Sequence, residues 1–117
     1  MIRIGFHDLL RTTAAATPSA AALSYKQETL HYVEVWNAVQ AIAHDLQGAG
    51  LRRGDRVAIY LEKRLETVIA MFAVSAAGGV FVPINHVLKA AQVEHILADS
   101  GTRVLFTSPE RLSLLAP

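Results

Sequence analysis

Two glycine-rich segments are the first candidates for phosphate chemistry. The segment from Gly48 to Gly54 reads Gly-Ala-Gly-Leu-Arg-Arg-Gly and superficially resembles a dinucleotide-binding loop. Its last glycine falls one residue late, and it leads from a helical pattern into a strand, whereas a phosphate cradle runs from a strand into a helix N-terminus. Gly78-Gly79 also precedes a strand. We therefore predict a helix end with a tight turn at the first segment, and close packing or a positive φ at the second.

The sequence contains no arrangement of residues that is typical of acid–base, nucleophilic or metal-dependent catalysis. Glu62 and Glu66 are separated by Lys63 and Arg64, and they fall near a predicted helix start, where negative charge is favourable in any case. No serine stands in a Gly-x-Ser-x-Gly elbow, and there is no cysteine. The sequence therefore predicts no catalytic residue.

The histidines are scattered and form no ligand motif. They stand at positions His7, His31, His44, His86 and His95. No His-Glu-x-x-His pattern occurs, so we predict that most of the histidines lie at the surface and that none is a metal-binding residue. His95 and Asp99 are one helical turn apart, which indicates at most an exposed pair on a helix.

Polar residues also follow each of three predicted strands. They are Glu62-Lys63-Arg64, Asn85-His86 and Thr107-Ser108. In a doubly wound sheet, ligands bind beyond the C-terminal ends of the strands. Asn85 and His86 could therefore donate or accept hydrogen bonds from a ligand, or simply turn the chain. No nucleophile or phosphate loop stands beside them, and we assign no cofactor-binding residue.

The spacing of apolar residues predicts the elements that position these residues. Continuous apolar runs predict strands near 56–61, 80–84 and 103–107, and three- and four-residue spacings predict helices near 33–47, 66–77 and 89–99. The fold class is therefore α/β, with a βαβαβ order that implies parallel strands and right-handed crossovers in a three-layer arrangement. If the strand order runs in one direction, both crossover helices cover one face; if it reverses, they divide between the two faces.

Shorter elements flank this unit. A helix over 6–16 ends before Thr17-Pro18, a small hairpin joins 22–25 to 29–32, and Ser108-Pro109-Glu110 starts a further helix. We expect the helix 33–47 to bury Trp36, Val39, Ile42, Ala43 and Leu46. We expect the helix 66–77 to bury Ile69, Phe72, Ala73 and Ala76.

Composition limits the class of protein. The 117 residues are 52% hydrophobic and 18% charged, with a net charge of +1, which predicts one folded domain over residues 1–117 rather than a disordered chain. Balanced charge argues against nucleic acid as a partner, and the absence of cysteine fits a reducing, cytoplasmic location. The uncharged run from Thr67 to Asn85 is divided by Gly78-Gly79, so we predict a helix and a buried strand there and no membrane span.

Several strings together carry a family resemblance that extends from about Phe6 to Ser108. They are Leu30-His31-Tyr32-Val33-Glu34-Val35, the run from Gly50 to Ile59, Glu66 with the run from Ala70 to Ala77, the run from Gly78 to Asn85, and the run from His95 to Ser100. In order and spacing they resemble the N-terminal part of the adenylate-forming enzymes. These include acyl-CoA and aryl-CoA synthetases, luciferases and the adenylation domains of peptide synthetases.

Two positions depart from the family pattern. His31 stands where threonine is usual, and His86 stands where proline commonly follows the asparagine. His86, with the run from Thr107 to Leu112, looks like the acyl-CoA ligases associated with exosortase loci.

The resemblance implies an ATP-dependent, AMP-forming ligase. A carboxylate attacks ATP to give an acyl-adenylate, which then passes to a thiol of CoA or a carrier protein, with Mg²⁺ at the phosphates. The family places its phosphate loop, its nucleotide-binding strings and its mobile lysine later in the chain. By resemblance, these 117 residues are an incomplete N-terminal subdomain with the remainder of the enzyme as partner, no cofactor site of their own and no activity alone.

Two other functions fit the pattern. A self-contained flavodoxin-like binding or signalling domain fits the length, although Pro83-Ile84-Asn85 lacks the acids of a phosphoacceptor site and Glu62-Lys63-Arg64 makes a poor phosphate turn. A noncatalytic scaffold that kept the fold is the other. If the chain is a fragment, an apolar patch or a free strand edge should promote self-association.

Overall fold

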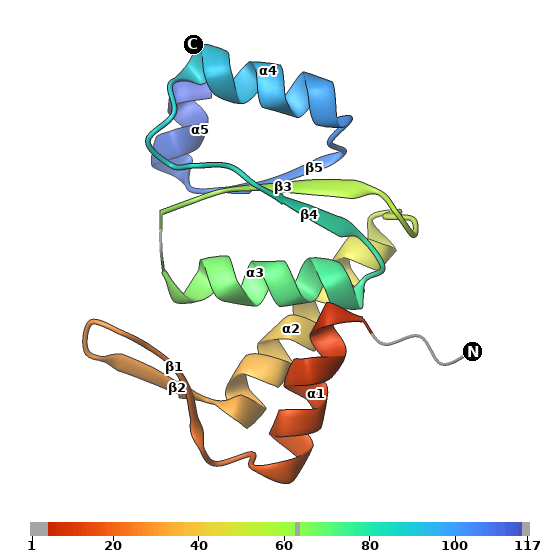
Figure 1. Cartoon of the computed structure of the whole chain (residues 1–117), viewed down its shortest axis with the longest axis vertical. Helices are drawn as coiled ribbons and strands as arrows, with labels where there is room; N and C mark the ends of the chain where they lie inside the picture. The colour runs from red at the N-terminus through yellow and green to blue at the C-terminus, as the bar shows by residue number, and fades with distance from the viewer. Residues whose placement is uncertain (1–4, 63, 116–117) are drawn as a thin grey trace.

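The computed structural model describes residues 5–62 and 64–115, in two sheets and five helices among them (Figure 1). In chain order the elements are α1 (Phe6–Ala16), β1 (Ala21–Tyr25), β2 (Glu28–His31), α2 (Tyr32–Gly48), β3 (Arg56–Tyr60), α3 (Leu65–Ala76), β4 (Val80–Pro83), α4 (Ala90–Ser100), β5 (Val104–Thr107) and α5 (Pro109–Leu115). The strands and helices expected from the sequence are all present, with ends that differ by one or two residues. Lys63, one of the polar residues singled out after β3, lies outside the described residues.

The larger sheet has three parallel strands in the order β4-β3-β5. Val57 of β3 lies beside Phe81 of β4 and Val104 of β5. The parallel pairing confirms the crossover prediction. Because β5 returns to the far side of β3, the order reverses, and α3 and α4 lie on opposite faces of the sheet (Figure 1).

Both faces of β3 are covered, as its continuous apolar run predicted. Val57 packs with α2 and α3 residues that include Leu46 and Val74. Ala58 and Tyr60 point the other way and pack with Val93 of α4. Successive side chains of a strand alternate between faces, so this one strand joins two cores. Strand β3 therefore connects the helices packed on one face of the sheet to those packed on the other.

A second layer lies on the side of α3 away from the sheet. Val35 and Val39 of α2 pack there with Leu10 of α1 and Ile69 of α3. The hairpin of β1 and β2 is antiparallel and lies against the same layer (Figure 1). Thus α3 is sandwiched between the sheet and the N-terminal elements.

The sandwiched position of α3 corrects the expected inward faces. Besides Ile69 and Ala73, α3 buries Ala70 and Val74, whereas Phe72 is only half-buried. In α2, Val35 is buried in place of Trp36. A helix with neighbours on two sides buries more than one stripe, so a single amphipathic face describes it poorly.

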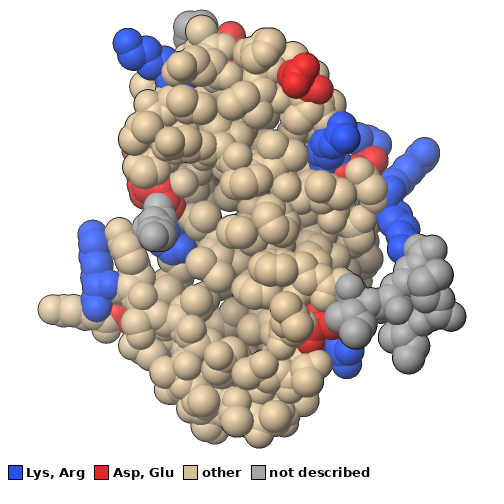
Figure 2. All heavy atoms as spheres, viewed as in Figure 1, with Lys and Arg blue, Asp and Glu red and all other residues tan. Residues whose placement is uncertain are grey.

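The described helices include none that is both long enough and apolar enough to cross a membrane. The run from Thr67 to Asn85 forms most of α3 and all of β4, which confirms the helix and strand predicted there. On the face seen in Figure 2, Lys and Arg side chains lie mainly toward the outline, several of them close to Asp or Glu. This face therefore carries no broad patch of one sign.

Candidate functional site

The reversal of strand order defines where a ligand site is expected. The connection after β3 covers one face and the connection after β4 covers the other, so a crevice opens outside the C-terminal ends of β3 and β5. Thr107, at the end of β5, donates a hydrogen bond from Oγ1 to the carbonyl of Tyr60, at 2.8 Å. Ser108 follows it and is buried. The hydrogen bond of Thr107 therefore joins the C-terminal ends of β3 and β5 at this edge.

Arg111 of α5 occupies this crevice and connects three segments. Its Nη2 lies 2.6 Å from a carboxylate oxygen of Glu62, which follows β3. Its Nη1 donates a hydrogen bond to the carbonyl of His86, which follows β4, at 2.5 Å. Its guanidinium also lies over the Tyr60 ring, 5.2 Å from the centroid. One side chain thus ties the ends of β3 and β4 to α5.

A small polar hollow adjoins this arginine. It measures about 370 Å³, and its lining residues are Glu62, Arg64, Ser108, Glu110, Arg111 and Leu114. Arg64 also pairs with Glu62, so one carboxylate faces two guanidinium groups. The cations of this hollow are therefore largely neutralised by the chain itself.

A larger apolar hollow lies on the other side of the same edge. It measures about 500 Å³ and is lined by residues of α2, α3 and β5, among them Ile42, Ile69 and Phe106. Arg64, Ser108 and Glu110 border both hollows. The edge therefore offers polar and apolar surface side by side.

The two polar residues after β4 have mainly structural contacts. Asn85 accepts a hydrogen bond at its side-chain oxygen from the amide of Val87, at 3.1 Å, which is the geometry of a side-chain-stabilised turn. His86 contributes its carbonyl to Arg111 while its side chain is exposed. Asn85 and His86 were expected either to contact a ligand or to turn the chain. The hydrogen bond within the Asn85 turn supports the second interpretation.

The arrangement can bind and orient but holds no reactive pair. The buried Nε of Arg111 has no hydrogen-bond partner among the described residues. Within 5–62 and 64–115, no group of three His, Asp or Glu side chains is placed to hold a metal ion. Glu66 lies exposed in the first turn of α3, whereas the Glu62 carboxylate pairs with Arg64 and Arg111.

The glycine-rich segments have the predicted geometry. Gly48 ends α2, Gly50 and Gly54 have φ angles of +97° and +85°, and the amide of Leu51 donates to the carbonyl of Leu46. This is a helix end followed by a turn. Gly78 has a φ of +88°, and a Cβ on Gly79 would lie 3.1 Å from the Asp55 carbonyl. The second segment therefore combines a positive φ with close packing.

The histidines do not converge. Those at 31, 44, 86 and 95 are exposed, and only His7 is half-buried. His31 lies 3.0 Å from Glu34, one turn into α2. Among the described residues, no hydrogen bond or ion pair joins His95 to Asp99. The expected surface location is thus confirmed for four of the five.

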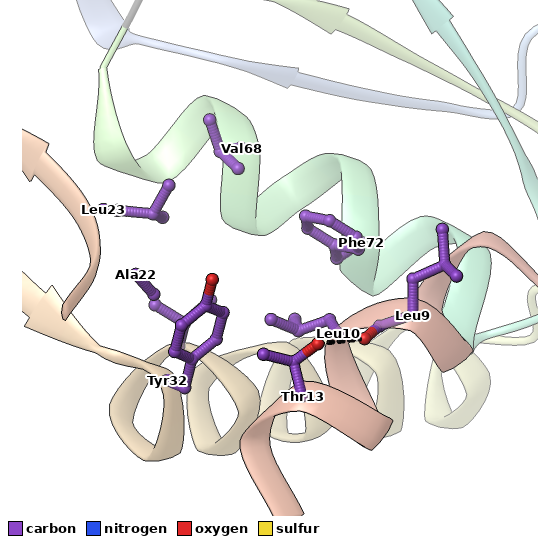
Figure 3. A pocket seen from close by; sticks show the side chains of 9 residues that line it. Leu9, Leu10, Thr13, Ala22, Leu23, Tyr32, Val68 and Phe72 are labelled. Atoms are coloured by element: carbon purple, nitrogen blue, oxygen red, sulfur yellow. Dashed lines mark hydrogen bonds between the residues drawn. The ribbon is translucent and has the colours of Figure 1, made fainter. Parts of the chain in front are cut away.

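An apolar hollow of about 280 Å³ lies beyond α3 from the sheet (Figure 3). Its lining residues are Leu9, Leu10, Thr13, Ala22, Leu23, Tyr32, Val35, Val68 and Phe72. Thr13 uses its hydroxyl to donate to the Leu9 carbonyl at 2.9 Å, so the Tyr32 hydroxyl is the other polar side-chain group among the lining residues (Figure 3). This hollow suits an apolar side chain better than a phosphate.

Arg111 is the residue of this edge that sequence reasoning did not single out as a site residue. Its partners Glu62 and His86 lie far away in the sequence, so no local motif reports the contact. The sequence offers only an indirect signal for the position of Arg111. A basic residue in the first turn after Ser108-Pro109 is positioned to reach back over the strand ends.

The fold and this edge define a doubly wound α/β unit with its crevice at the switch point. The family model described as AMP-binding enzyme matches residues 10–116, and the chain belongs to that family. This confirms the resemblance to adenylate-forming enzymes. The finer likeness to the exosortase-associated group stays a prediction.

Curated relatives are considerably longer than this chain. A feruloyl-CoA synthase of Amycolatopsis sp. is 38% identical over 103 residues, which cover 88% of this chain and 21% of the relative. The fatty acid–[acyl-carrier-protein] ligase ScoC of Streptomyces coeruleorubidus is 42% identical over 106 residues, covering 87% of this chain and 20% of the relative. The chain thus spans about a fifth of the length of these relatives.

Solved structures have the same fold over most of the chain. The N-terminal domain of FACL13 from Mycobacterium tuberculosis matches with a TM-score of 0.90 at 26% identity, covering 97% of this chain and 29% of that one. The NpsA N-terminal subdomain of Klebsiella oxytoca matches with a TM-score of 0.83 at 30% identity, covering 90% and 28%. This chain is therefore similar to one part of an adenylation N-terminal domain.

Proposed function

We propose that this chain is the N-terminal part of an AMP-forming acid–thiol ligase, which activates a carboxylate as an acyl-adenylate and transfers it to CoA or a carrier-protein thiol. The single observation that carries the proposal is the family match over residues 10–116. The names of two relatives, a feruloyl-CoA synthase and a fatty acid–[acyl-carrier-protein] ligase, support this reaction class. Residues 1–117 are on this proposal an incomplete subdomain, with the remainder of the enzyme as partner and the cytoplasm as location.

The described residues of this chain do not fit ATP and Mg²⁺ by themselves. Among the described residues, the two cations that line the polar hollow at this edge, Arg64 and Arg111, share the carboxylate of Glu62. The glycine turn at Gly50 and Gly54 leads into a strand, so it directs no helix N-terminus at a phosphate. We therefore propose that the reaction takes place on other parts of the longer enzyme and that the isolated chain is inactive.

The contribution of this chain is instead a rigid platform. Strand β3 is buried on both faces, and Arg111 fixes the segments after β3, β4 and β5 to one another. Active-site groups of enzymes must be held to within a fraction of an ångström, which requires such supporting contacts. We propose that the edge formed by these segments faces the reacting groups in the longer enzyme.

The proposal is tested by a chimera. The segment of the feruloyl-CoA synthase that aligns with this chain is replaced by residues 10–116, and carboxylate-dependent ATP–pyrophosphate exchange is measured. We expect exchange in the chimera and none in the isolated chain or in a relative that lacks the segment. A folded chimera without exchange, or exchange by the isolated chain, would contradict the proposal.

A further inference from the structure

A cluster of Ser75, His7 and Asp8 lies at the other end of the sheet from the crevice. The start of α1 lies beside the C-terminal end of α3 (Figure 1). There, Nδ1 of His7 lies 2.9 Å from Oγ of Ser75, although the two residues are 68 positions apart. The Nε2 atom of His7 lies 3.6 Å from a carboxylate oxygen of Asp8. We propose that Ser75 is an acylation site, at which His7 takes the hydroxyl proton and a small activated carboxylic ester supplies the acyl group.

The charge of Asp8 favours one tautomer of His7. The Gly5 amide donates a hydrogen bond to the Asp8 carboxylate at 2.7 Å, and this bond holds the pKa of Asp8 below its ordinary value. An ionised carboxylate near Nε2 favours the tautomer that carries the proton on Nε2, which leaves a lone pair on Nδ1. Asp8 is therefore a positioning residue, at a distance slightly longer than a hydrogen bond.

The hydroxyl of Ser75 then has one direction for its proton. The backbone amide of His7 donates to Ser75 Oγ at 3.1 Å, so one lone pair of the oxygen is occupied. The proton lies toward Nδ1, and the remaining lone pair is free to attack. A serine hydrogen-bonded to a base that is itself oriented by a third group is the general arrangement of an activated nucleophile.

The imidazole of His7 is held in place. A Cβ on Gly5 would lie 2.7 Å from Cε1 and 2.8 Å from Nδ1 of His7, so the ring rests against the space that glycine leaves. The cluster also opens to solvent. Ser75, His7 and Asp8 line a hollow of about 710 Å³ together with Gln47 and Arg53, whose side chains carry N–H donors. A small ester can therefore reach the hydroxyl.

The reaction balances without any further reagent. Oγ of Ser75 forms a bond to the ester carbonyl carbon while its proton moves to Nδ1 of His7. As the tetrahedral intermediate collapses, the bond to the leaving oxygen breaks and the proton passes from His7 to that oxygen. The products are an O-acyl serine and the free alcohol. The N–H donors of Gln47 and Arg53 are of the kind that stabilise the negative oxygen.

The test uses the 117-residue chain and p-nitrophenyl acetate. Acetyl groups are located by peptide mass spectrometry, and ester-linked acetyl is identified by its removal with hydroxylamine. Two serines in the same molecule serve as controls. The Ser24 hydroxyl is hydrogen-bonded to the Thr29 hydroxyl, and the Ser113 hydroxyl donates a hydrogen bond to the Glu110 carbonyl, so neither hydroxyl is hydrogen-bonded to an imidazole among the described residues. General base catalysis supplies about 10² to 10⁴ in rate, so we expect Ser75 to react at least about tenfold faster than either.

Variants then assign the base. His7→Gln keeps a hydrogen-bonding group but cannot take the proton, and we expect it to lower acetylation of Ser75 to the level of the control serines. Gly5→Ala keeps all three reacting groups but displaces the ring, and the same loss is expected. His95→Gln, at an exposed histidine, leaves the rate unchanged. Acetylation of Ser75 no faster than that of Ser24 and Ser113 overturns the proposal without any variant, and an unchanged rate in folded His7→Gln also overturns it.

Discussion

Replacing Arg111 by alanine is expected to destabilise the chain by about 3 kcal/mol. The substitution removes a hydrogen bond from a charged donor to the His86 carbonyl, worth about 1.5–3 kcal/mol. It also removes the ion pair with the partly exposed Glu62, worth about 0.5–1 kcal/mol, and the contact of the cation with the Tyr60 ring, worth about 0.5–1 kcal/mol. These contributions overlap, so their sum is an upper bound.

Urea unfolding followed by circular dichroism measures this effect. With a slope of about 1–3 kcal/mol per M, a loss of about 3 kcal/mol lowers the unfolding midpoint by roughly 1–3 M. Arg103→Ala is the matched control. The Arg103 side chain is 56% exposed and, among the described residues, forms one ion pair, 3.4 Å from Asp55, so its loss should stay within about 0.5 kcal/mol. Equal midpoints for the two variants would refute the role given to Arg111.

Three further expectations follow from the fold. Val39 is fully buried, so Val39→Ala should cost about 2 kcal/mol while exposed Val33→Ala costs less than about 0.5 kcal/mol; similar unfolding midpoints would contradict this. The lowered pKa of Asp8 means that its ionised form stabilises the fold above pH 3.8 and loses this effect as the pH falls below that value. The difference in Tm between the parent chain and Asp8→Asn should therefore shrink between pH 6 and pH 3. A difference in Tm that stays constant over this range would contradict the stabilising role of the Asp8 carboxylate. Strands β4 and β5 are the edge strands of the described three-stranded sheet, and Val80 of β4 is 50% exposed. Light scattering should therefore detect self-association of the chain, and a monomer at high concentration would contradict this.

Local patterns were sufficient to predict most elements. The helix over Phe6–Ala16 and the strand around Val57 follow from apolar spacing and from the glycines and prolines that bound them. Strand order was not predictable, because either direction of crossover satisfies the same local pattern. The buried face of α3 was only partly predicted for a related reason. Ala70 and Val74 contact neighbours that arrive from distant parts of the chain.

The polar cluster around Arg111 and the polar cluster around Ser75 were also not predictable from local patterns. Glu62, His86 and Arg111 meet only because three parallel strands end at one edge. His7 and Ser75 meet only because α1 folds back onto α3. Neither contact leaves a periodic signal in the sequence. The family resemblance was predictable because its strings are local, and it supplied the reaction class that the residues alone did not.

The central claim is that this chain supplies a platform and that the nucleotide site is built by the remainder of a longer enzyme. Isothermal titration calorimetry of the isolated chain with ATP and Mg²⁺ tests it most directly. We expect no saturable binding tighter than about 1 mM, which corresponds to about 4 kcal/mol of binding free energy. Saturable binding in the micromolar range would contradict the claim and would make the turn between Gly48 and Gly54 a candidate phosphate-binding site.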